Sequence, residues 1–521
     1  MSDTKYLYGA AVQGIQSFIF QTNKLREIVG ASELVEEICT SKFEEIVGQK
    51  CDKDNPNSIL HAAGNIKYIF DTKEECEKVV RIFPKTISEF APGVTVSQAV
   101  VKMEGKYTQF KDAVNELEKR LRTQRNKPMR SATLGLMAIE RSRQTGLPVT
   151  FVKKENRFGR EETIRIDQGT RNKLYSDPSG EWLKTTKSLC EKAFGISFKD
   201  HDDRIAYNIE DITQKNDWIA IIHADGNGLG QVVQKVGDKK EEFKKFSELL
   251  DKATVLSSQK SYQYIKEVYK LKEDELIPIR PIVIGGDDLT VVCRADLALD
   301  YVTKFIGEFE HNTRELLGVT LLNHNVFENE SDKRLTACAG IAYIKSSFPF
   351  YYGYELAEAL CSRAKKDAKA DLNDGELAKS CLMFHKVQDS FTEDWDAIVK
   401  RELTPQNNIS FEYGPYYVDN AKEGRKTVEE LKDYAKNLDS KEGNAVKSHL
   451  RQWMSLLHDN PEMAKQKLLR LKSMTAMKSY VDELTTDLKR KVGDKEVTVY
   501  PVYDILAIHT ISTQETREVE K

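Results

Sequence analysis

The feature that most constrains the fold is an order of apolar segments that occurs twice in this 521-residue chain. In its first occurrence, four strand patterns and two helical patterns follow one another as βαββαβ: strands at 6–12, 58–62, 66–70 and 94–103, and helices at 14–47 and 73–90. The tight-turn sequence at 63–65 joins the second strand to the third. This order is typical of a ferredoxin-like fold.

The second occurrence begins after residue 215 and follows the same order, with one further helix at its end. Its predicted elements are strands at 218–224, 279–284, 289–293 and 335–344, and helices at 229–269, 296–316 and 354–370. Two such units in one chain predict an α+β fold. A polar, turn-rich segment separates them, and helical patterns dominate after residue 393.

Composition narrows the class of protein. The formal charge is −3, and the eight cysteines are scattered without a Cys-x-x-Cys pair. Reduced cysteines, the lack of a signal-peptide pattern at the start and the lack of an apolar run of about 20 residues predict a cytoplasmic protein without a membrane span. No zinc site is expected, because a cysteine-rich module needs paired spacings.

Three acidic residues lie at two loops of the second unit. Asp225 directly follows an apolar strand, and Asp287 with Asp288 occupies the turn of the following hairpin. The first and third strands of a βαββαβ sheet are neighbours, so these carboxylates are expected to converge. Converging carboxylates repel one another unless a cation lies among them. We therefore predict that Asp225, Asp287 and Asp288 are catalytic and bind two Mg²⁺ or Mn²⁺ ions.

Small residues beside these acids favour a nucleotide ligand. Gly285 and Gly286 permit a tight turn and close approach of a nucleotide. Gly226, Asn227 and Gly228 follow the strand, and the glycines leave backbone N–H groups open to phosphate. The sequence predicts that all five contact the nucleotide. Asp-Gly-Asn-Gly or Gly-Gly-Asp-Asp alone more often marks an ordinary turn. The prediction of a nucleotide site rests on their occurring together, at two loops that the topology brings close to each other.

The first unit provides an internal comparison. Aligning 11–15 with 225–229 and 63–66 with 285–288 places Ala11, Asn65 and Ile66 where the second unit has its acids. The first unit is therefore predicted to bind no metal. Gly14, Arg26 and the Gly-Ala-Ser sequence at 30–32 could still contact a nucleotide, and helix capping and packing explain them equally well.

Four segments resemble the large subunit of type III CRISPR–Cas effector complexes, which carries paired palm domains, one of them with Gly-Gly-Asp-Asp. The similar segments are GIQSFIFQTNKLREIVGAS at 14–32, ADGNGLG at 224–230, IGGDDLTVV at 284–292 and AGIAYIKSSFPFYYGYELAEALCSRAKK at 339–366. The resemblance implies palm domains at 1–140 and 215–392, an insert at 141–214 and a helical C-terminal domain at 393–521.

The resemblance also implies an activity, the joining of ATP into cyclic oligoadenylate messengers in antiviral defence. Lys365, and Lys345 earlier in the same similar segment, would reach triphosphate oxygens. Other CRISPR effector subunits and guide or target RNA are the implied partners. Two departures are a first unit that starts near residue 6, where many such subunits have an HD nuclease domain, and missing zinc-binding cysteines between the palms.

Two other functions fit parts of the sequence. A catalytically silent scaffold would use basic residues at 119–143 and 465–491 to follow RNA phosphates. A signalling cyclase of the GGDEF type would use GTP in place of ATP, since nothing in the sequence fixes the base. His223, two residues before Asp225, is expected to be a core or supporting residue rather than a metal ligand.

Overall fold

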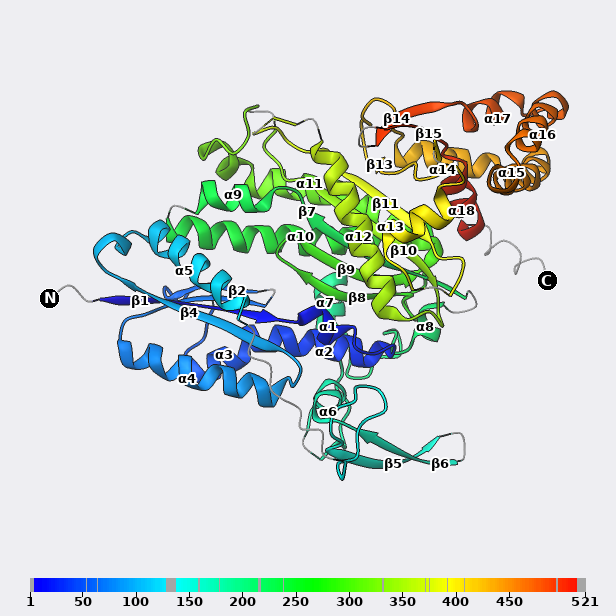
Figure 1. Ribbon diagram of the computed structural model, residues 1–521. Coiled ribbons are helices and arrows are strands. Elements are labelled where there is room, and N and C mark those ends of the chain that lie inside the picture. The colour runs from blue at the N-terminus through cyan, green and yellow to red at the C-terminus, as the bar shows by residue number, and fades with distance from the viewer. Residues whose placement is uncertain are drawn as a thin grey trace.

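The computed structural model describes residues 4–512 except 53, 63, 128–136, 158–159, 178, 214–216, 238, 330–331, 371, 374, 391, 407 and 493–494. It has the predicted mixed α+β composition, with four sheets among the described residues. Figure 1 shows the first unit, the second unit and the C-terminal helices following one another across the molecule. None of the described helices combines the length and the apolar character that crossing a membrane requires.

The first unit is built on a four-stranded antiparallel sheet in the order β2-β3-β1-β4. One face of the sheet packs against α2–α4, where the Tyr8, Phe43 and Phe83 rings meet. On the other face, Leu7 and Val101 of the sheet pack against α5. The elements are β1 (Lys5–Gln13), α1 (Ile15–Ile19), α2 (Leu25–Cys39), α3 (Ser41–Val47), β2 (Ser58–Ala62), β3 (Asn65–Phe70), α4 (Lys73–Phe90), β4 (Thr95–Met103), η1 (Gly105–Tyr107) and α5 (Phe110–Arg125).

The long helix predicted at 14–47 is three helices. The chain leaves helical geometry at Lys24, which is extended, and again at Thr40. The Thr40 hydroxyl donates to the Glu36 carbonyl and so satisfies a group at the end of α2. The apolar periodicity runs through both breaks, because all three helices contribute buried residues to one hydrophobic core. Periodicity alone does not reveal such interruptions.

The second unit has a six-stranded sheet in the order β13-β11-β10-β7-β9-β8. Its last four strands have the order expected of βαββαβ, and β11 extends the sheet by pairing parallel to β10. The predicted helix at 229–269 ends and restarts around Gly237. The elements are β7 (Trp218–Gly226), α9 (Leu229–Val236), α10 (Lys240–Val268), β8 (Ile279–Gly285), β9 (Asp288–Arg294), η2 (Ala295–Leu297), α11 (Ala298–Asn323), β10 (Ala337–Lys345), α12 (Phe350–Lys369), β11 (Cys381–Lys386) and β13 (Tyr416–Tyr417).

The two units pack directly against each other. The Phe20 ring of the first stacks on the Tyr354 ring of the second, with centroids 4.2 Å apart. Gln16 donates from Nε2 to the Tyr354 hydroxyl at 2.9 Å, and the Ser32 hydroxyl on α2 donates to the Ile282 carbonyl on β8. One hydrophobic core runs through both units, so their relative position is fixed by packing.

The insert contacts both units. Its elements are β5 (Phe151–Arg157), β6 (Arg160–Ile166), α6 (Gln168–Leu174), α7 (Ser188–Phe194) and α8 (Ile209–Thr213). Lys173 on α6 is buried and donates to the Phe18 carbonyl of the first unit at 2.7 Å. Helix α7 packs on α10 and β8 of the second unit.

The C-terminal region is not wholly helical, which corrects the sequence-based prediction. Strands β14 and β15 form a hairpin that joins β12 in a three-stranded sheet. Val497, Thr498 and Val499 are β-branched and favour a strand. The prediction missed this strand because it extended the helical pattern of the preceding segment to the end of the chain. The elements are α13 (Trp395–Ile398), η3 (Val399–Leu403), β12 (Ile409–Ser410), α14 (Val428–Asn437), α15 (Lys441–Asp459), α16 (Pro461–Met474), α17 (Lys478–Leu484), β14 (Leu488–Val492), β15 (Lys495–Val499) and α18 (Val502–Ser512).

Candidate metal and nucleotide site

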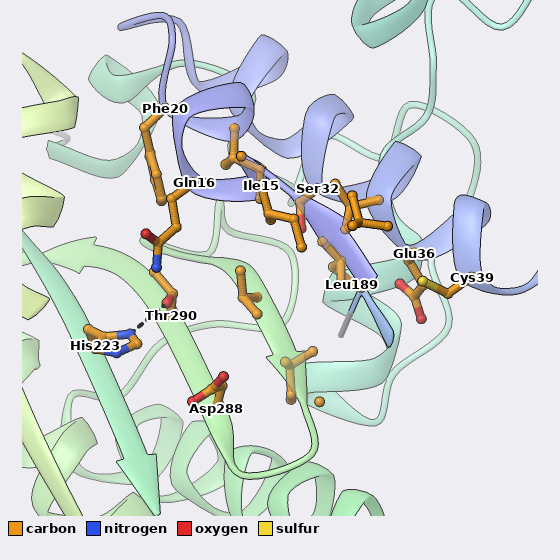
Figure 2. A pocket seen from close by; sticks show the side chains of 18 of the residues that line it. Ile15, Gln16, Phe20, Ser32, Glu36, Cys39, Leu189, His223, Asp288 and Thr290 are labelled. Carbon is orange, nitrogen blue, oxygen red and sulfur yellow. Dashed lines mark hydrogen bonds between the residues drawn. The ribbon is translucent and has the colours of Figure 1, made fainter. Parts of the chain in front are cut away.

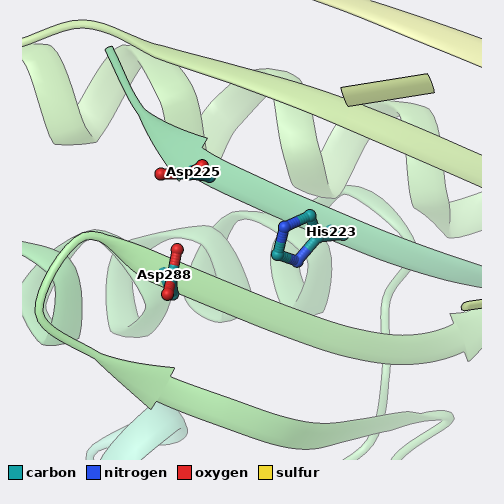
Figure 3. Close-up of side chains that lie close together, drawn as sticks. All are labelled: His223, Asp225 and Asp288. Atoms are coloured by element: carbon teal, nitrogen blue, oxygen red, sulfur yellow. The ribbon is translucent and has the colours of Figure 1, made fainter. Parts of the chain in front are cut away.

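Two neighbouring strands bring Asp225 and Asp288 together. Ala224 on β7 pairs with Leu289 on β9, so Asp225 lies opposite Asp288 at the next position. Each offers a carboxylate oxygen, and these atoms lie within 4.8 Å of one another and of a His223 ring nitrogen. Figure 3 shows the two carboxylates facing each other from adjacent strands. The convergence of these two residues agrees with the expectation from strand order.

Asp287 completes the acidic group from the turn of the hairpin. Its carboxyl lies against Gly226, since a Cβ added there would be 2.8 Å from Asp287 Oδ2. A larger residue at position 226 would displace this side chain. Gly226 therefore makes room for the acid, a function that differs from the predicted phosphate contact.

The environment of the acids favours their neutral forms. Burial, followed by the charge of Asp225, raises the pKa of Asp287 to about 7. Burial, followed by the charges of Asp287 and Asp225, raises the pKa of Asp288 to about 8. Ionised carboxylates in such a group are costly without a counter-charge. Hard divalent cations prefer oxygen ligands, so the donor set fits Mg²⁺ or Mn²⁺.

Lys365 supplies a positive charge at this group. From α12, its ammonium contacts the Asp225 carboxylate and donates to the Gly226 carbonyl at 2.8 Å. One of the three carboxylates is thus paired with a cation. The predicted contact between Lys365 and a triphosphate stays a prediction.

His223 lies beneath the acids and is neutral. Burial lowers its pKa to about 4. Its Nδ1 lies 3.2 Å from the Thr290 hydroxyl, and its ring meets the Tyr354 ring edge-on at 5.7 Å. A hydrogen-bonded, packed ring fits the predicted supporting role, and its nearness to Asp225 and Asp288 leaves one ring nitrogen within reach of a shared ion.

The Gly-Gly turn is held by side chains that sequence reasoning did not identify. Gly286 has φ +61°, a conformation that favours glycine. The Thr254 hydroxyl donates to the Gly286 carbonyl at 2.5 Å, and the Gly286 N–H donates to Asp251 Oδ1 at 3.3 Å. Both side chains come from α10, more than 30 residues earlier in the chain, and no local motif marks them. Gly285 lies next to the same Asp251 carboxylate.

The remaining small residues have different surroundings. Gly228 begins α9 with φ +70°, and a Cβ there would meet nothing within 4 Å, so its backbone is open to a ligand. Asn227 is buried. Its backbone N–H donates to the Thr336 carbonyl at 2.8 Å and its Nδ2 to the Thr336 hydroxyl at 3.1 Å. Asn227 therefore anchors the loop to the residue preceding β10, and its predicted nucleotide contact stays a prediction.

Lys345 does not join the site. It pairs with Trp218 at one end of the β7–β10 ladder, whereas Cys338 pairs with Asp225 near the other. Seven residues of strand, roughly 23 Å, separate these positions. Its ammonium lies 5.9 Å from the Trp218 ring centroid. The prediction that Lys345 reaches the triphosphate is wrong, because the strand carries it to the opposite edge of the sheet.

A cavity of about 470 Å³ opens beside the acids, between the two units. Figure 2 shows Ile15, Gln16 and Phe20 of the first unit facing Asp288 and Thr290 of the second across it. Its volume lies within the range of small-molecule sites. The cavity is bordered by Asp288 of the acidic group, by Gly14 and Gly64 of the first unit, and by α7 of the insert.

In the first unit, the hairpin corresponds to that of the second with a shift of one residue. Ala11 pairs with Asn65, so Asn65 occupies the position of Asp288 and Gly64 that of Asp287. The sequence alignment, which matched Asn65 to Asp287, was wrong by one position. The corrected correspondence still leaves the first unit without a carboxylate at these positions.

Arg26 and the Gly-Ala-Ser sequence at 30–32 are the other residues of the first unit that could contact a nucleotide. Arg26 lies over the Tyr207 ring of the insert, 4.3 Å from its centroid. A Cβ on Gly30 would lie 1.9 Å from the Lys173 carbonyl oxygen, so this glycine permits close packing of the insert. Ser32 bonds to β8 and also borders the cavity. Packing therefore explains Arg26 and Gly30.

Comparison with protein families matches part of the second unit. Residues 218–373 match the family described as Cas10/Cmr2, second palm domain. None of the curated proteins compared with the sequence gives a significant match.

Several solved structures are similar over almost the whole chain. A Csm1–Csm4 cassette in complex with pppApA has a TM-score of 0.58 at 14% identity, covering 98% of this chain and 69% of that one. The cassette with AMPPNP has a TM-score of 0.57 at 13% identity, with 98% and 70% covered. The Csm1–Csm4 subcomplex of the type III-A CRISPR–Csm interference complex has 0.52 at 13%, again with 98% and 70% covered.

These findings agree with the resemblance first noted in the four sequence segments. The match covers the unit that carries Asp225, Asp287 and Asp288, and the fold likeness extends to the unit without them. Residues 218–373 are therefore similar to the second palm domain of the Cas10/Cmr2 family, and the fold of the whole chain is similar to that of Csm1.

Proposed function

We propose that this protein is a two-metal nucleotidyltransferase that joins ATP into cyclic oligoadenylate in a CRISPR-type antiviral response. The observation that carries the proposal is the convergence of Asp225, Asp287 and Asp288 at the edge of a cavity between the two units. The similar cassettes were solved in complex with ATP, pppApA and cA3, which supports adenine nucleotides as the substrate class.

In this proposal, the three acids hold two divalent cations, which lower the pKa of an attacking hydroxyl and neutralise charge on a leaving pyrophosphate. The raised pKa values of Asp287 and Asp288 mean that these carboxyls carry protons near neutral pH until an ion displaces them. Gly228, whose surroundings are open at the start of α9, offers its backbone to phosphate. Lys365 is free to move from Asp225 to a phosphate oxygen once an ion takes its place.

The reaction forms a bond between the 3′ oxygen of one ATP and the α-phosphorus of another, and breaks the bond to pyrophosphate. Two nucleotides must therefore lie side by side. The first unit provides the opposing wall of the cavity, with Gln16 and Gly14 bordering it. In this division of the chain, the palm at 1–140 positions one nucleotide and the palm at 215–392 carries the ions. The insert (141–214) and the C-terminal region (393–521) make up the rest of this division.

The test is incubation of the purified protein with labelled ATP and Mg²⁺ or Mn²⁺, with and without RNA and candidate partner subunits. Wild type is expected to form oligoadenylates, and the Asp287→Ala/Asp288→Ala variant none. Parallel reactions with GTP distinguish a GGDEF-type cyclase. An inert wild type under all conditions, or a double variant as active as wild type, refutes the proposal.

A role in an RNA-binding complex is compatible with this activity and forms part of the proposal. The Csm1–Csm4 pairing in the similar structures supports a partner subunit. The basic residues offer mixed support for RNA binding. Lys119 and Arg122 on α5 are exposed, whereas Arg490 is largely buried and donates to the Gly424 carbonyl, and Lys472 is paired with Asp482. Arg130 lies outside the described residues.

A further inference from the structure

The charged side chains that border the cavity between the two units are mostly acidic. Among the described residues that border it, the carboxylates are Glu36, Asp251 and Asp288, and Lys192 is the one lysine or arginine. A nucleotide triphosphate brings up to four negative charges into such a cavity. Part of that charge needs a protein cation in addition to the metal ions, since desolvated phosphate is costly without one.

Lys192 comes from α7 of the insert, a segment that carries no recognised motif. Its ammonium donates to the Ile284 carbonyl at 3.1 Å and lies 3.4 Å from Asp251 Oδ1. Ile284 directly precedes the Gly-Gly turn, and a Cβ on Gly285 would lie 3.9 Å from Lys192 Nζ. An ammonium group has three N–H donors, and these contacts leave one for a ligand.

Contacts with both units fix the position of helix α7, and with it the backbone of Lys192. The Gln259 side chain on α10 donates to the Lys192 backbone carbonyl at 3.0 Å. The Ser188 hydroxyl, one turn earlier on α7, donates to Glu33 of the first unit at 2.7 Å. Leu189 and Phe194 are buried in the core. The backbone is thus fixed, while the side chain is partly exposed towards the cavity, at 28%.

We propose that Lys192 binds a phosphate of the nucleotide in this cavity, so that the insert supplies part of the nucleotide site. This inference rests on the proposed function and adds a binding residue from outside both palms. Its two present partners are a neutral carbonyl at 3.1 Å and a carboxylate at 3.4 Å, and a phosphate oxygen at a shorter distance would form a stronger, charge-assisted hydrogen bond. If the Lys192 ammonium moved to a phosphate, Asp251 would still accept the hydrogen bond from the Gly286 N–H.

The test measures binding separately from turnover. Isothermal titration with α,β-methylene-ATP, AMP and adenosine in Mg²⁺ compares wild type, Lys192→Ala, Lys192→Arg and the control Lys199→Ala. Lys199 is an exposed lysine of the same insert that does not border the cavity. The methylene group prevents transfer of the nucleotide, so the protein remains in its binding state throughout.

A phosphate contact predicts losses that grow with the number of phosphates. Lys192→Ala is expected to weaken α,β-methylene-ATP binding about tenfold and AMP binding less, with adenosine unchanged. Lys192→Arg is expected to restore most of the affinity, and Lys199→Ala to match wild type. Equal losses for all three ligands identify a brace for the Gly-Gly turn and overturn the inference, as does unchanged triphosphate binding.

The outcomes also separate this inference from the proposed function. A wild type that binds α,β-methylene-ATP in a Lys192-dependent way but never forms oligoadenylate from ATP contradicts the proposed function alone. A wild type that forms oligoadenylate, with Lys192→Ala binding as tightly as wild type, contradicts this inference alone. A wild type that binds none of the three ligands contradicts both.

Discussion

The Lys365 ammonium on α12 contacts the Asp225 carboxylate at the end of β7, and the two come from positions 140 residues apart in sequence. The same ammonium donates to the Gly226 carbonyl, so it is fixed at the edge of the acidic group. This contact neutralises one charge among three carboxyls without a bound ion. It also means that an ion binding Asp225 competes with Lys365.

Lys365→Met is expected to make the protein depend more strongly on divalent cations for stability. Removing the ammonium leaves the acids facing one another, which we expect to cost roughly 1–2 kcal/mol without metal. Added Mn²⁺ should then raise the melting temperature more than in wild type. Differential scanning fluorimetry with and without Mn²⁺ measures this. Lys366→Met, which removes an exposed charge next to it, is the control, and equal Mn²⁺ effects in both variants would contradict the prediction.

Gly226→Ala is expected to displace Asp287 and so weaken ion binding. The new methyl group would lie 2.8 Å from Asp287 Oδ2, which forces the side chain or the strand to move. We expect at least a tenfold loss of Mn²⁺ affinity by titration calorimetry. Gly230→Ala is the matched control, because a Cβ there meets nothing within 4 Å. Wild-type affinity in Gly226→Ala would show that this close approach has no function.

Ion binding at the acidic group should strengthen as the pH rises. The pKa values of about 7 for Asp287 and about 8 for Asp288 mean that an ion must displace protons at pH 6 and few at pH 9. Mn²⁺ affinity is expected to rise up to about tenfold per pH unit for each proton displaced. Calorimetry in buffers of different ionisation enthalpy counts the protons released. A pH-independent affinity with no release would contradict the raised pKa values.

A second buried acid predicts a pH dependence of folding far from this site. Burial raises the pKa of Asp504 to about 7, although a hydrogen bond from the Tyr416 hydroxyl at 2.9 Å opposes the shift. The unfolded chain loses this proton near pH 4 and the folded chain only near pH 7. The stabilising contribution is therefore complete below pH 4 and is lost as the pH rises to about 7.

Denaturant titrations between pH 4 and 8 measure this contribution. The slope from Asp504 is at most about 1.4 kcal/mol per pH unit. Asp504→Asn removes the titrating group and should flatten the profile over that range. Asp433→Asn, which removes an exposed acid on α14, should keep the wild-type slope. A profile that is the same in Asp504→Asn and wild type would contradict the assignment.

The sequence predicted the parts of this site that depend on local pattern and strand order. Asp225 follows a run of apolar residues, and the hairpin acids lie between two such runs, so the topology alone places Asp225 near Asp288. Lys365 was found through its similar segment, and the structure places it at the acids. The α+β class followed from the repeated order of elements.

Residues that act across long sequence separations could not be predicted. Asp251 and Thr254 hold the Gly-Gly turn from the middle of a long helix, where nothing distinguishes them from other polar positions. Lys345 was misplaced because a similar segment does not say at which end of a strand a residue lies. The bond from Asn227 to Thr336 could not be predicted either, because a turn motif does not reveal which group a side chain faces.

The most direct test of the account is the number of Mn²⁺ ions bound per chain in the presence of α,β-methylene-ATP, measured by electron paramagnetic resonance titration. Wild type is expected to bind two ions, and Asp225→Asn and Asp287→Ala/Asp288→Ala are each expected to lose both tight sites. Two ions bound with unchanged affinity in these variants would place the metal site elsewhere and contradict the account.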